Sequence, residues 1–413
     1  MLSWLTRNTL DRKEKIIADW IERKISDIGT VVGGATPSTK KPENYENGKI
    51  AWITPKDLST FTSRYIERGE RNITEVGLRS CSTQLLPKNT VLFSSRAPIG
   101  YVAIAANEVC TNQGFKSVVP NEKTDPLFLF YLLKYNKDKI EGMGSGTTFK
   151  EVSGTTMKNI VVNVPTDKGV QEKIAAILGS IDDKIEENEQ INKNLEEQSS
   201  TLFVNMFGHF IDSLDNSDIK LGDLIESVYN RGKTPPLSDE PTDYPIIDVR
   251  ALSSNSRIID YTNCTKYVSK ETYNNWFRSG HPKEYDILIS TVGSLAEIKI
   301  FLGTTGCIAQ NVVGFRTKGI SPLYLYQYLN YIKNDLVAYN IGSVQPSIKV
   351  THIIKHSIYV ASKEDIEIFD SIARDITKKI FANCQENEAL KQIRDTLLPK
   401  LMSGELDVSN IEI

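Results

Sequence analysis

The residue patterns that could hold a nucleotide are incomplete in this chain. Residues 232–234 read Gly-Lys-Thr, as at the end of a phosphate-binding loop, but Ser227 stands where that loop requires a glycine. Residues 142–146 carry three alternating glycines, yet they lack the final spacing and the preceding strand of a dinucleotide-binding loop. A flexible or ligand-facing turn is the better interpretation of this stretch, and we predict no bound cofactor.

Patterns for metal and nucleophile chemistry are incomplete as well. His352 and His356 are four residues apart, but no glutamate stands between them, and the surrounding sequence is typical of a strand rather than of the helix of a zinc-protease motif. The sequence contains neither a Gly-x-Ser-x-Gly nucleophile motif nor an Asp-Pro-Pro-Tyr type of methyltransferase motif. We therefore predict no catalytic residue and no metal site.

Length and composition are those of an ordinary globular protein. The 413 residues suffice for two or three domains, each with its own core. No apolar run approaches the ~20 residues of a membrane span, and the N-terminus lacks the apolar core and cleavage site of a secretion signal. The five cysteines are far apart and include no Cys-x-x-Cys pair, which predicts reduced thiols and a cytoplasmic location.

Charge is distributed unevenly along the chain. The net charge of −3 does not favour nonspecific binding of polyanions. Residues 166–200 carry −5 and residues 363–413 carry −4, so the rest of the chain is net basic. We expect a polyanion to meet the basic blocks, although exposed helix faces rich in glutamate would produce the same asymmetry.

The elements that must position any functional residue are two long helices. Between Val170 and Phe207, apolar residues return at steps of four and three, a heptad pattern interrupted by Asn188 and Asn192. About 37 residues at ~1.5 Å each form a helix roughly 55 Å long. A related pattern returns 195 residues later, and its matched positions include Ile174 and Phe369, Ile181 and Ile376, Ile185 and Ile380, Asn188 and Asn383, Asn192 and Asn387, Leu195 and Leu390, and Leu202 and Leu397.

Each of these helices needs a partner, because an amphipathic helix gains most of its stability from packing its apolar face. We expect the two copies to pair. Asparagine in such a seam weakens a coiled coil but fixes its register, since each amide must find another polar group. The chain between the helices is long enough to return, which favours an antiparallel pair. The alternative is that each helix packs only on its own domain.

Two blocks of mixed helix and strand pattern precede the helices. The strand-like segments of the first block are 49–53, 90–94, 101–105 and 159–164. A helix begins after Asp125, with Pro126 in its first turn. The second block repeats this plan at an offset of 196, so that Pro126 corresponds to Pro322 and Leu133 to Leu329. The loops between matched positions diverge, which favours one kind of task on two different targets.

The two helices carry a family resemblance. Residues 385–406 are very similar to the C-terminal conserved helix of the specificity subunits of type I restriction–modification systems, and residues 181–195 are similar to their central conserved helix. Residues 149–160 are similar to the segment that closes the recognition domains of that family. The resemblance covers nearly the whole chain, and the helices are its specific part.

The resemblance implies an α+β fold class: two α/β target-recognition domains in pseudo-twofold arrangement, separated by two long antiparallel coiled-coil helices. The implied segments are a helical lead at 1–24, target-recognition domain 1 at 25–165, a central conserved helix at 166–208, target-recognition domain 2 at 215–362 and a C-terminal conserved helix at 363–405.

The resemblance also implies a function. A non-catalytic specificity subunit would bind double-stranded DNA at a bipartite asymmetric site, and each domain would read one half. The paired helices would set the spacing and dock two modification (methyltransferase) subunits and, through them, two restriction (ATP-dependent motor-nuclease) subunits. Half-sites one helical turn apart, ~34–36 Å, suit a rod of this length.

Loop residues at strand ends and glycine-rich turns are the candidates for DNA contact, because base edges and phosphates are met by Arg, Lys, Asn, Gln, Ser and Thr. In the first block they are Lys56, Ser94, Ser95, Arg96, Asn112, Gln113, Thr147, Thr148 and Lys150. In the second block they are Arg231, Lys233, Arg250, Ser290, Thr291, Gln310, Asn311, Ser343, Gln345 and Lys349.

Two other functions fit parts of the pattern. A coiled-coil scaffold whose two α/β domains bind protein or glycan ligands has the same architecture, and it predicts no sequence-dependent retention on DNA. An enzyme with a site between the domains requires convergent titratable groups, for which the sequence offers no obvious set.

Overall fold

The chain forms two compact units. The computed structural model describes residues 19–411 apart from 147–149, 215–216, 231–233 and 304. Residues 1–186 and 389–413 make up unit 1, and residues 187–388 make up unit 2. The division falls within both long helices, so each unit holds one domain together with a part of each helix. We call the part of unit 1 before the first long helix domain 1, and the part of unit 2 between the helices in sequence domain 2.

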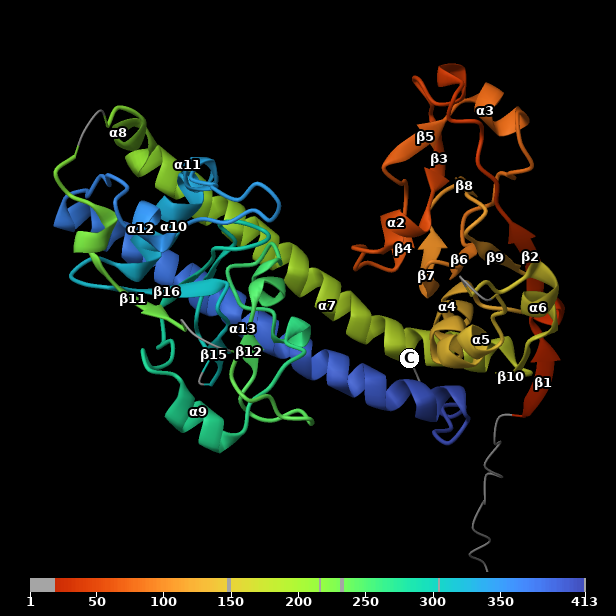
Figure 1. Ribbon diagram of the computed structural model, residues 1–413. Coiled ribbons are helices and arrows are strands. Elements are labelled where there is room, and N and C mark those ends of the chain that lie inside the picture. The colour runs from red at the N-terminus through yellow and green to blue at the C-terminus, as the bar shows by residue number, and fades with distance from the viewer. Residues whose placement is uncertain (1–18, 147–149, 215–216, 231–233, 304, 412–413) are drawn as a thin grey trace, which may run out of the picture. The chain divides into compact units, whose positions relative to one another are not determined.

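Domain 1 contains three sheets. A five-stranded sheet has the order β2-β9-β6-β7-β4, a three-stranded sheet has the order β5-β3-β8, and β1 pairs with β10 (Figure 1). The strands are β1 (Trp20–Lys24), β2 (Gly29–Gly33), β3 (Ile50–Ile53), β4 (Tyr65–Ile66), β5 (Arg71–Ile73), β6 (Val91–Ser95), β7 (Ile99–Ala105), β8 (Val109–Thr111), β9 (Lys116–Pro120) and β10 (Val161–Pro165). The helices are α1 (Ile25–Ile28), α2 (Pro55–Leu58), α3 (Glu75–Arg79), α4 (Pro126–Tyr135), α5 (Lys137–Gly142) and α6 (Gly154–Asn159).

Helix α4 lies in the core of domain 1. The Asp125 carboxylate accepts a hydrogen bond from the Phe128 N–H at 2.7 Å, and Pro126 stands in the first turn, where no N–H is needed. The six side chains of residues 128–133 are buried and share one apolar core with Val91. The helix and the four strands expected in the first block are therefore confirmed.

Domain 2 repeats this plan with fewer strands. Its sheets have the orders β11-β16-β13-β14 and β12-β15. The strands are β11 (Ile225–Tyr229), β12 (Ile246–Ile247), β13 (Ile287–Ser290), β14 (Ile298–Ile300), β15 (Cys307–Ile308) and β16 (Val312–Thr317). The helices are α8 (His209–Asp212), α9 (Lys270–Trp276), α10 (Pro322–Tyr331), α11 (Lys333–Ala338) and α12 (Val350–Ile353).

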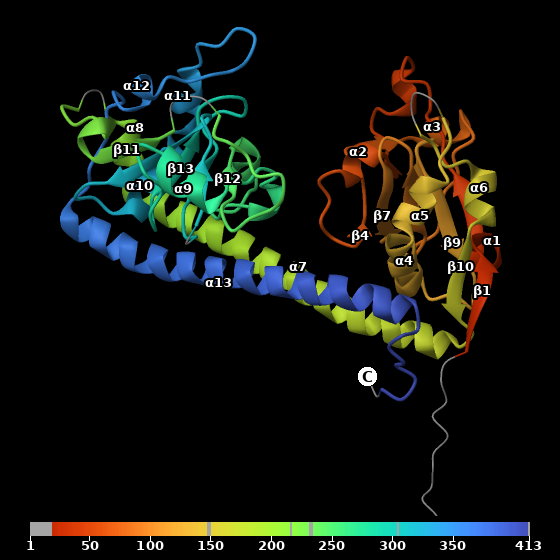
Figure 2. The same cartoon turned by 60° about the horizontal axis from the view of Figure 1, so that its bottom comes forward.

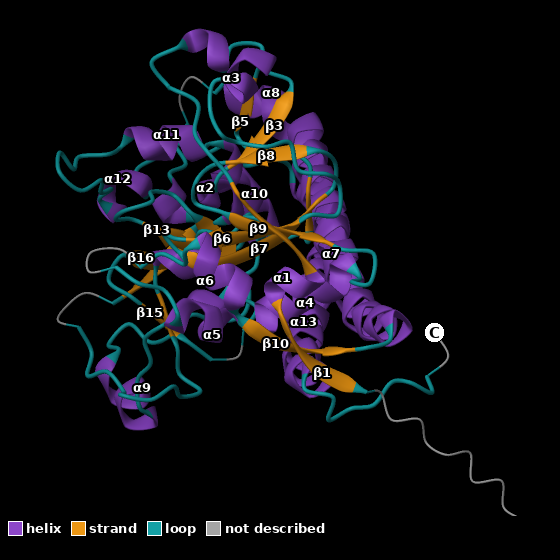
Figure 3. Cartoon of the chain, turned by 90° about the vertical axis from the view of Figure 1, so that its right-hand side faces the viewer, coloured by secondary structure: helices purple, strands orange, loops and turns teal. Residues whose placement is uncertain are grey.

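The two domains share one strand order. Strands β2, β9, β6 and β7 follow one another across the sheet of domain 1 as β11, β16, β13 and β14 do in domain 2. The first three strands of domain 2 begin 196 residues after their counterparts in domain 1. Short strands and short helices are mixed in both domains, as expected for an α+β protein (Figure 3).

The long helices α7 (Lys168–Phe203) and α13 (Lys363–Met402) lie side by side within each unit (Figures 1 and 2). In unit 2 the Asn188 side-chain amide donates to the side chain of Asn387 at 2.9 Å, and that of Asn383 donates to Asn192 at 2.8 Å. Residue numbers rise along α7 as they fall along α13, so the predicted antiparallel pairing is confirmed. Because Asn383 and Asn387 are the counterparts of Asn188 and Asn192, the two bonds are one contact repeated about a local twofold axis.

In unit 1 the start of α7 pairs with the end of α13. Arg394 forms an ion pair with Asp182 at 2.8 Å, and the Tyr131 hydroxyl donates to the other oxygen of Asp182 at 2.6 Å. Burial and the neighbouring Asp182 raise the pKa of Tyr131 above its ordinary value, so this hydroxyl stays a donor. Leu401, near the end of α13, is buried in the same core as Ile174 of α7.

Two local expectations were wrong. Residues 20–24 form strand β1, which pairs antiparallel with β10, whereas the sequence predicted a helical lead at 1–24; residues 1–18 lie outside the described part of the chain. The partners of β1 come from a segment about 140 residues later, which local apolar spacing does not reveal. His352 lies in the short helix α12 and not in a strand.

No helix among the described residues is both long and apolar enough to span a bilayer.

Candidate nucleic-acid interface

In domain 1, loops from distant parts of the sequence meet and form what we call loop cluster 1. Its segments are 54–57, 94–100, 112–114, 144–146 and 150–151. The N–H of Asn112 donates to the carbonyl of Ile53 at 3.0 Å, and the N–H of Ser95 donates to Gly114 at 2.7 Å. The N–H of Val152 donates to the Ser95 carbonyl at 2.9 Å. These backbone bonds hold the loops against one another without using side chains.

Loop cluster 2 of domain 2 is built in the same way. Its segments are 248–250, 291–297, 309–311 and 340–349. The N–H of Ala309 donates to Ile247 at 2.9 Å, that of Thr291 donates to Asn311 at 2.8 Å, and that of Ile348 donates to the Thr291 carbonyl at 2.8 Å. The three bonds join the loops in the same order as in domain 1. Two domains with divergent loops thus share one backbone scaffold.

A buried serine hydroxyl shapes the turn that leaves β6 and β13. Ser94 Oγ donates to the carbonyl of Pro98 and accepts the N–H of Tyr101, both at 2.8 Å. Ser290 Oγ donates to the carbonyl of Ser294 at 2.5 Å and accepts the N–H of Glu297 at 2.8 Å. Each hydroxyl therefore satisfies backbone groups on both sides of its turn, which is a structural task.

Four of the predicted DNA contacts need correction for this reason. Ser94, Ser95, Ser290 and Thr291 are buried. Ser95 Oγ donates to Gly114 at 3.1 Å, and Thr291 Oγ1 donates to the Asn311 carbonyl at 3.3 Å. Because their hydroxyls face the inside of the domain, these four residues support the loops, and we do not propose them as contacts to bases.

Most of the other predicted residues point to solvent. Those with exposed side chains are Lys56, Gln113, Lys150, Arg250, Gln310, Ser343, Gln345 and Lys349. Those that are half-buried are Arg96, Asn112 and Asn311. Those that lie outside the described residues are Thr147, Thr148, Arg231 and Lys233. The exposed set is present in both clusters, and it consists of the side-chain types that reach base edges and phosphates.

The charges of loop cluster 1 favour an anionic ligand. Glu151 lies between Arg96, at 3.3 Å, and Lys116, at 3.2 Å. One carboxylate between two cations leaves a positive balance, to which the exposed Lys150 adds. Lys116 was not predicted from the sequence. It begins β9, and only the folded chain places its ammonium within 3.4 Å of Ser95 Oγ.

Lys56, within loop cluster 1, forms a surface ion pair. Its ammonium lies 2.7 Å from Glu70, and both side chains are more than half exposed. The hydrogen bond with Glu70 raises the pKa of Lys56 above its ordinary value. A depression of about 360 Å³ beside the pair is lined by Lys56, Phe61, Arg68 and Glu70 among others. Because solvent screens so exposed a pair, a phosphate can replace Glu70 as the partner of Lys56.

In loop cluster 2, Arg250 is held but still accessible. Its guanidinium donates to Asp248 at 2.8 Å and to the Thr265 hydroxyl at 2.7 Å, and the side chain is 52% exposed. Within the described part of domain 2, these two partners leave other N–H groups of the fork free for an acceptor in solution.

Val344, at the tip of loop cluster 2, was not predicted as a contact from the sequence. The side-chain oxygen of Asn340 accepts the N–H groups of Gly342 and Ser347, both at 2.9 Å, and so closes the base of the loop. The apex is Val344, which is 97% exposed. An apolar apex flanked by two predicted contact residues suits contact with a thymine methyl group. The only sequence signal is the turn chemistry of Gly342 and Pro346.

The described residues hold no group of three or more His, Cys, Asp or Glu side chains that could bind a metal ion. The five cysteines all lie among the described residues, and none of them forms a disulfide. His356 accepts or donates one hydrogen bond to the Tyr339 hydroxyl at 2.8 Å, and burial lowers its pKa. This histidine lies in the packing of domain 2 rather than in a ligand set.

Comparison with known proteins agrees with this architecture. The family model of the type I restriction modification DNA specificity domain matches residues 17–197 and 214–386. The type I restriction enzyme MjaIX specificity subunit of Methanocaldococcus jannaschii is 34% identical over 436 residues, which cover 96% of each chain. The HindI specificity subunit of Haemophilus influenzae is 23% identical over 94% of this chain and all of that one.

A solved structure shares the fold. The S subunit of a type I restriction–modification system from M. genitalium matches with a TM-score of 0.57 and 18% identity, over 94% of this chain and 97% of that one. Two matches to the family model, one in each half of the chain, agree with the duplicated sheets and helices described above. The chain therefore belongs to the family of DNA specificity subunits of type I restriction–modification systems.

Proposed function

We propose that this chain is the non-catalytic reader of a type I restriction–modification complex. Each domain reads one half of a bipartite, asymmetric site in double-stranded DNA, domain 1 through loop cluster 1 and domain 2 through loop cluster 2. The observation that carries the proposal is that one backbone scaffold, built twice, presents two different sets of exposed polar side chains. One scaffold with two sets of contact residues suits the reading of two different half-sites.

The paired helices have two tasks in this proposal. Helix α7 has 36 residues and hence a length of ~54 Å, which suits a spacer between two half-sites about one turn of DNA apart. The helices also dock two modification subunits, which carry the S-adenosylmethionine chemistry, and through them two restriction subunits. Exposed Ile368 and Ile372, one turn apart on α13, support a protein contact on this helix.

Methylation mapping tests the proposal. The chain is expressed with its modification subunits in cells without other methyltransferases, and methylated motifs are read by sequencing. We expect one bipartite, asymmetric motif with a fixed spacer. A continuous palindrome, or no methylated motif, contradicts the proposal and leaves the alternative of a scaffold for protein or glycan ligands.

Loop substitutions assign the half-sites. Gln113→Ala in loop cluster 1 is expected to relax the motif at positions of one half, and Gln345→Ala in loop cluster 2 at positions of the other half. Loss of discrimination in both halves from either single substitution contradicts the division of labour between the domains.

A further inference from the structure

In each unit, one buried arginine joins the domain to a long helix. Arg64 of domain 1 is 5% exposed, and Arg257 of domain 2 is completely buried. Arginine is rarely buried so fully, because the ion loses its water and needs full compensation by hydrogen bonds. The hydrogen bonds of both guanidinium groups go to the long helices.

Arg64 is attached to α7 at four places. Its backbone N–H donates to Glu186 Oε1 at 3.0 Å, and its Nε donates to the same oxygen at 3.2 Å. Nη1 donates to the carbonyl of Gly179 at 3.3 Å, and Nη2 pairs with Asp183. A side chain at Gly179 would come within 3.3 Å of this guanidinium, so the glycine keeps the carbonyl accessible.

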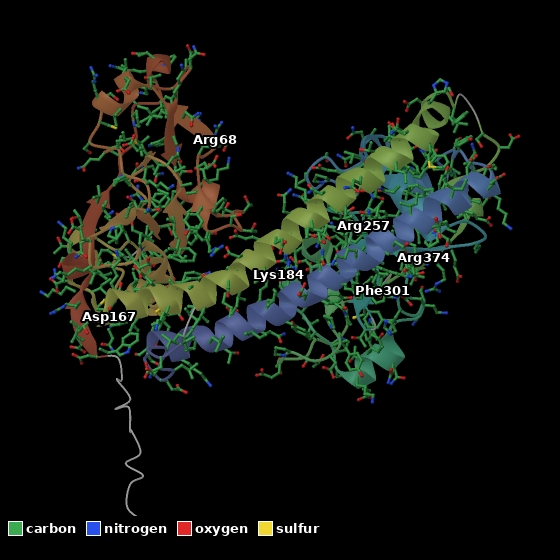
Figure 4. The ribbon with its side chains drawn as sticks, turned by 180° about the vertical axis from the view of Figure 1, so that it is seen from behind. Arg68, Asp167, Lys184, Arg257, Phe301 and Arg374 are labelled. Atoms are coloured by element: carbon green, nitrogen blue, oxygen red, sulfur yellow. The ribbon has the colours of Figure 1, made fainter. Side chains whose placement is uncertain are left out.

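Arg257 is attached to both helices of unit 2 (Figure 4). Its backbone N–H donates to Glu196 Oε1 at 2.8 Å, and Nη2 donates to Glu196 Oε2 at 2.7 Å. Nη1 donates to the hydroxyl of Thr377 on α13 at 2.6 Å. The guanidinium also lies 5.3 Å from the ring centre of Tyr326 in α10, a cation–π contact within domain 2.

The two arginines occupy the same place in the duplicated fold. The carbonyl of Arg64 accepts the N–H of Ile104, and that of Arg257 accepts the N–H of Ile300, both at 2.8 Å. Ile104 and Ile300 are 196 residues apart, the offset of the duplication, whereas the arginines are 193 apart. The segment from the arginine to this isoleucine is thus three residues longer in domain 2 than in domain 1. In both domains the arginine nevertheless binds a carboxylate of a long helix.

The geometry restrains rotation as well as distance. In each case one carboxylate, Glu186 or Glu196, binds both the backbone and the side chain of the arginine, and a second group on a helix binds the far end of the guanidinium. A rigid planar fork held at both ends fixes the direction of the loop that carries it. We propose that Arg64 and Arg257 are positioning residues that set the orientation of each domain on its helix, and with it the direction in which loop clusters 1 and 2 meet DNA.

This inference rests on the proposed function, and the spacer of the methylated motif is its readout. Arg257→Met removes the hydrogen bonds of this guanidinium to Glu196 and Thr377. Arg316→Met is the matched control. It removes an ion pair with the buried Asp286 at 2.7 Å, and both residues of this pair belong to domain 2. The wild-type and variant chains are assembled with modification subunits. Methylation is then measured on a DNA library in which the spacer between the half-sites varies by one base pair in each direction.

We expect Arg257→Met to raise methylation at the wrong spacers severalfold relative to methylation at the correct spacer. Arg316→Met should leave the spacer profile sharp, even if it lowers the melting temperature by the same amount. Arg64→Met is expected to act as Arg257→Met does. Equal spacer profiles for Arg257→Met and Arg316→Met overturn the inference.

A milder pair of variants covers the case in which Arg257→Met does not fold. Arg257→Lys keeps the charge but loses the fork, and Glu196→Gln keeps an acceptor for the backbone N–H but loses the charge. Both are expected to broaden the spacer profile, and a sharp profile in both overturns the inference. If the wild-type chain itself yields no bipartite motif, it is the proposed function that fails.

Discussion

At the scale of single residues, the loops of both domains contain two kinds of polar side chain: buried ones that hold the loop backbone in place and exposed ones that point to solvent. The hydroxyls of Ser94 and Ser290 could hydrogen-bond a base, but each bonds the backbone of the turn that follows it. Lys150 and Lys349 stand at the end of the same loop in their respective domains and are exposed. The backbone of each cluster is therefore fixed by buried polar groups, so exposed residues are free to differ between the domains.

Lys349 is expected to contact a phosphate. Lys349→Gln should weaken binding of the assembled complex to specific and nonspecific DNA alike, and it should lower the slope of log K against log salt by ~0.9. Anisotropy titrations over a series of salt concentrations measure both quantities. Lys270→Gln, at the first residue of α9, is the control of equal charge and should leave the slope unchanged. An equal effect of the two variants would refute a specific role for Lys349.

Lys299 makes the stability of domain 2 depend on pH. Burial lowers its pKa to about 8, from an ordinary value of 10.5, and its ammonium donates to the carbonyls of Ser254 and Ser256. Below pH 8 Lys299 is charged in the folded protein, where burial makes the charged form less favourable than it is in the unfolded chain. Between pH 8 and 10.5 the unfolded chain binds more protons, so this contribution to stability improves as pH rises.

Lys299→Met should remove this dependence. From pH 7 to pH 9 the free energy of unfolding of the wild type is expected to rise, relative to the variant, by about 1 kcal/mol. Denaturant titrations of both proteins at the two pH values measure the difference, and cysteines and tyrosines common to both cancel in the comparison. Parallel pH profiles would mean that Lys299 is not a source of the dependence.

At the scale of elements, the long helices are joined by buried amides. Asn188 and Asn383 are each 1% exposed, and each bonds an asparagine of the other helix. Leucine at these four positions would fill the seam but would accept neighbouring registers, because apolar contact has no direction. The amides therefore select one register at some cost in stability.

A double-mutant cycle tests this interpretation. Asn188→Leu alone removes the N–H that the side-chain oxygen of Asn387 accepts, and it should lower the free energy of unfolding by about 1–3 kcal/mol. Asn188→Leu with Asn387→Leu removes both amides, so its loss of stability should be smaller than the sum of the two single losses. Chemical denaturation of the full chain measures Asn188→Leu, Asn387→Leu and the double variant. If the two single losses simply add in the double variant, the amides do not depend on each other.

At the scale of the whole molecule, the chain closes on itself within unit 1. After α13, the positive φ of Gly404 (+78°) turns the backbone next to the indole of Trp20, where a side chain at position 404 would clash. Val408 is 3% exposed, and Lys173 donates to the carbonyl of Ser409 at 2.6 Å. Residues 404–409 thus complete the core that β1 begins.

Deletion of residues 403–413 should loosen unit 1 selectively. Loss of the buried Val408 side chain alone costs about 2 kcal/mol. Hydrogen exchange is therefore expected to accelerate in β1 and β10, whereas the amides of β13 in unit 2 keep their protection. Mass spectrometry of the intact and shortened chains resolves these segments. A uniform acceleration in both units would show that the tail stabilises the chain globally instead.

The sequence by itself determined what is periodic or repeated. Seven-residue spacing, the matched asparagines and the offset of 196 predict two helices, their pairing and two domains of one fold, because each is a pattern along the chain. The composition of the loops predicts the kinds of side chain that we propose to meet DNA. Lys56, Gln113 and Lys349 were predicted as contacts and are exposed; that they contact DNA stays a prediction.

Tertiary structure alone decided which polar groups face inward. Ser94 and Lys150 look equally suitable in sequence, but the folded turn after β6 buries the Ser94 hydroxyl between Pro98 and Tyr101 and leaves Lys150 in solvent. The same holds for β1, whose partner strand is remote, and for Arg64 and Arg257, whose unequal offset hides their equivalence. The burial of a side chain depends on atoms that the chain brings together only when it folds.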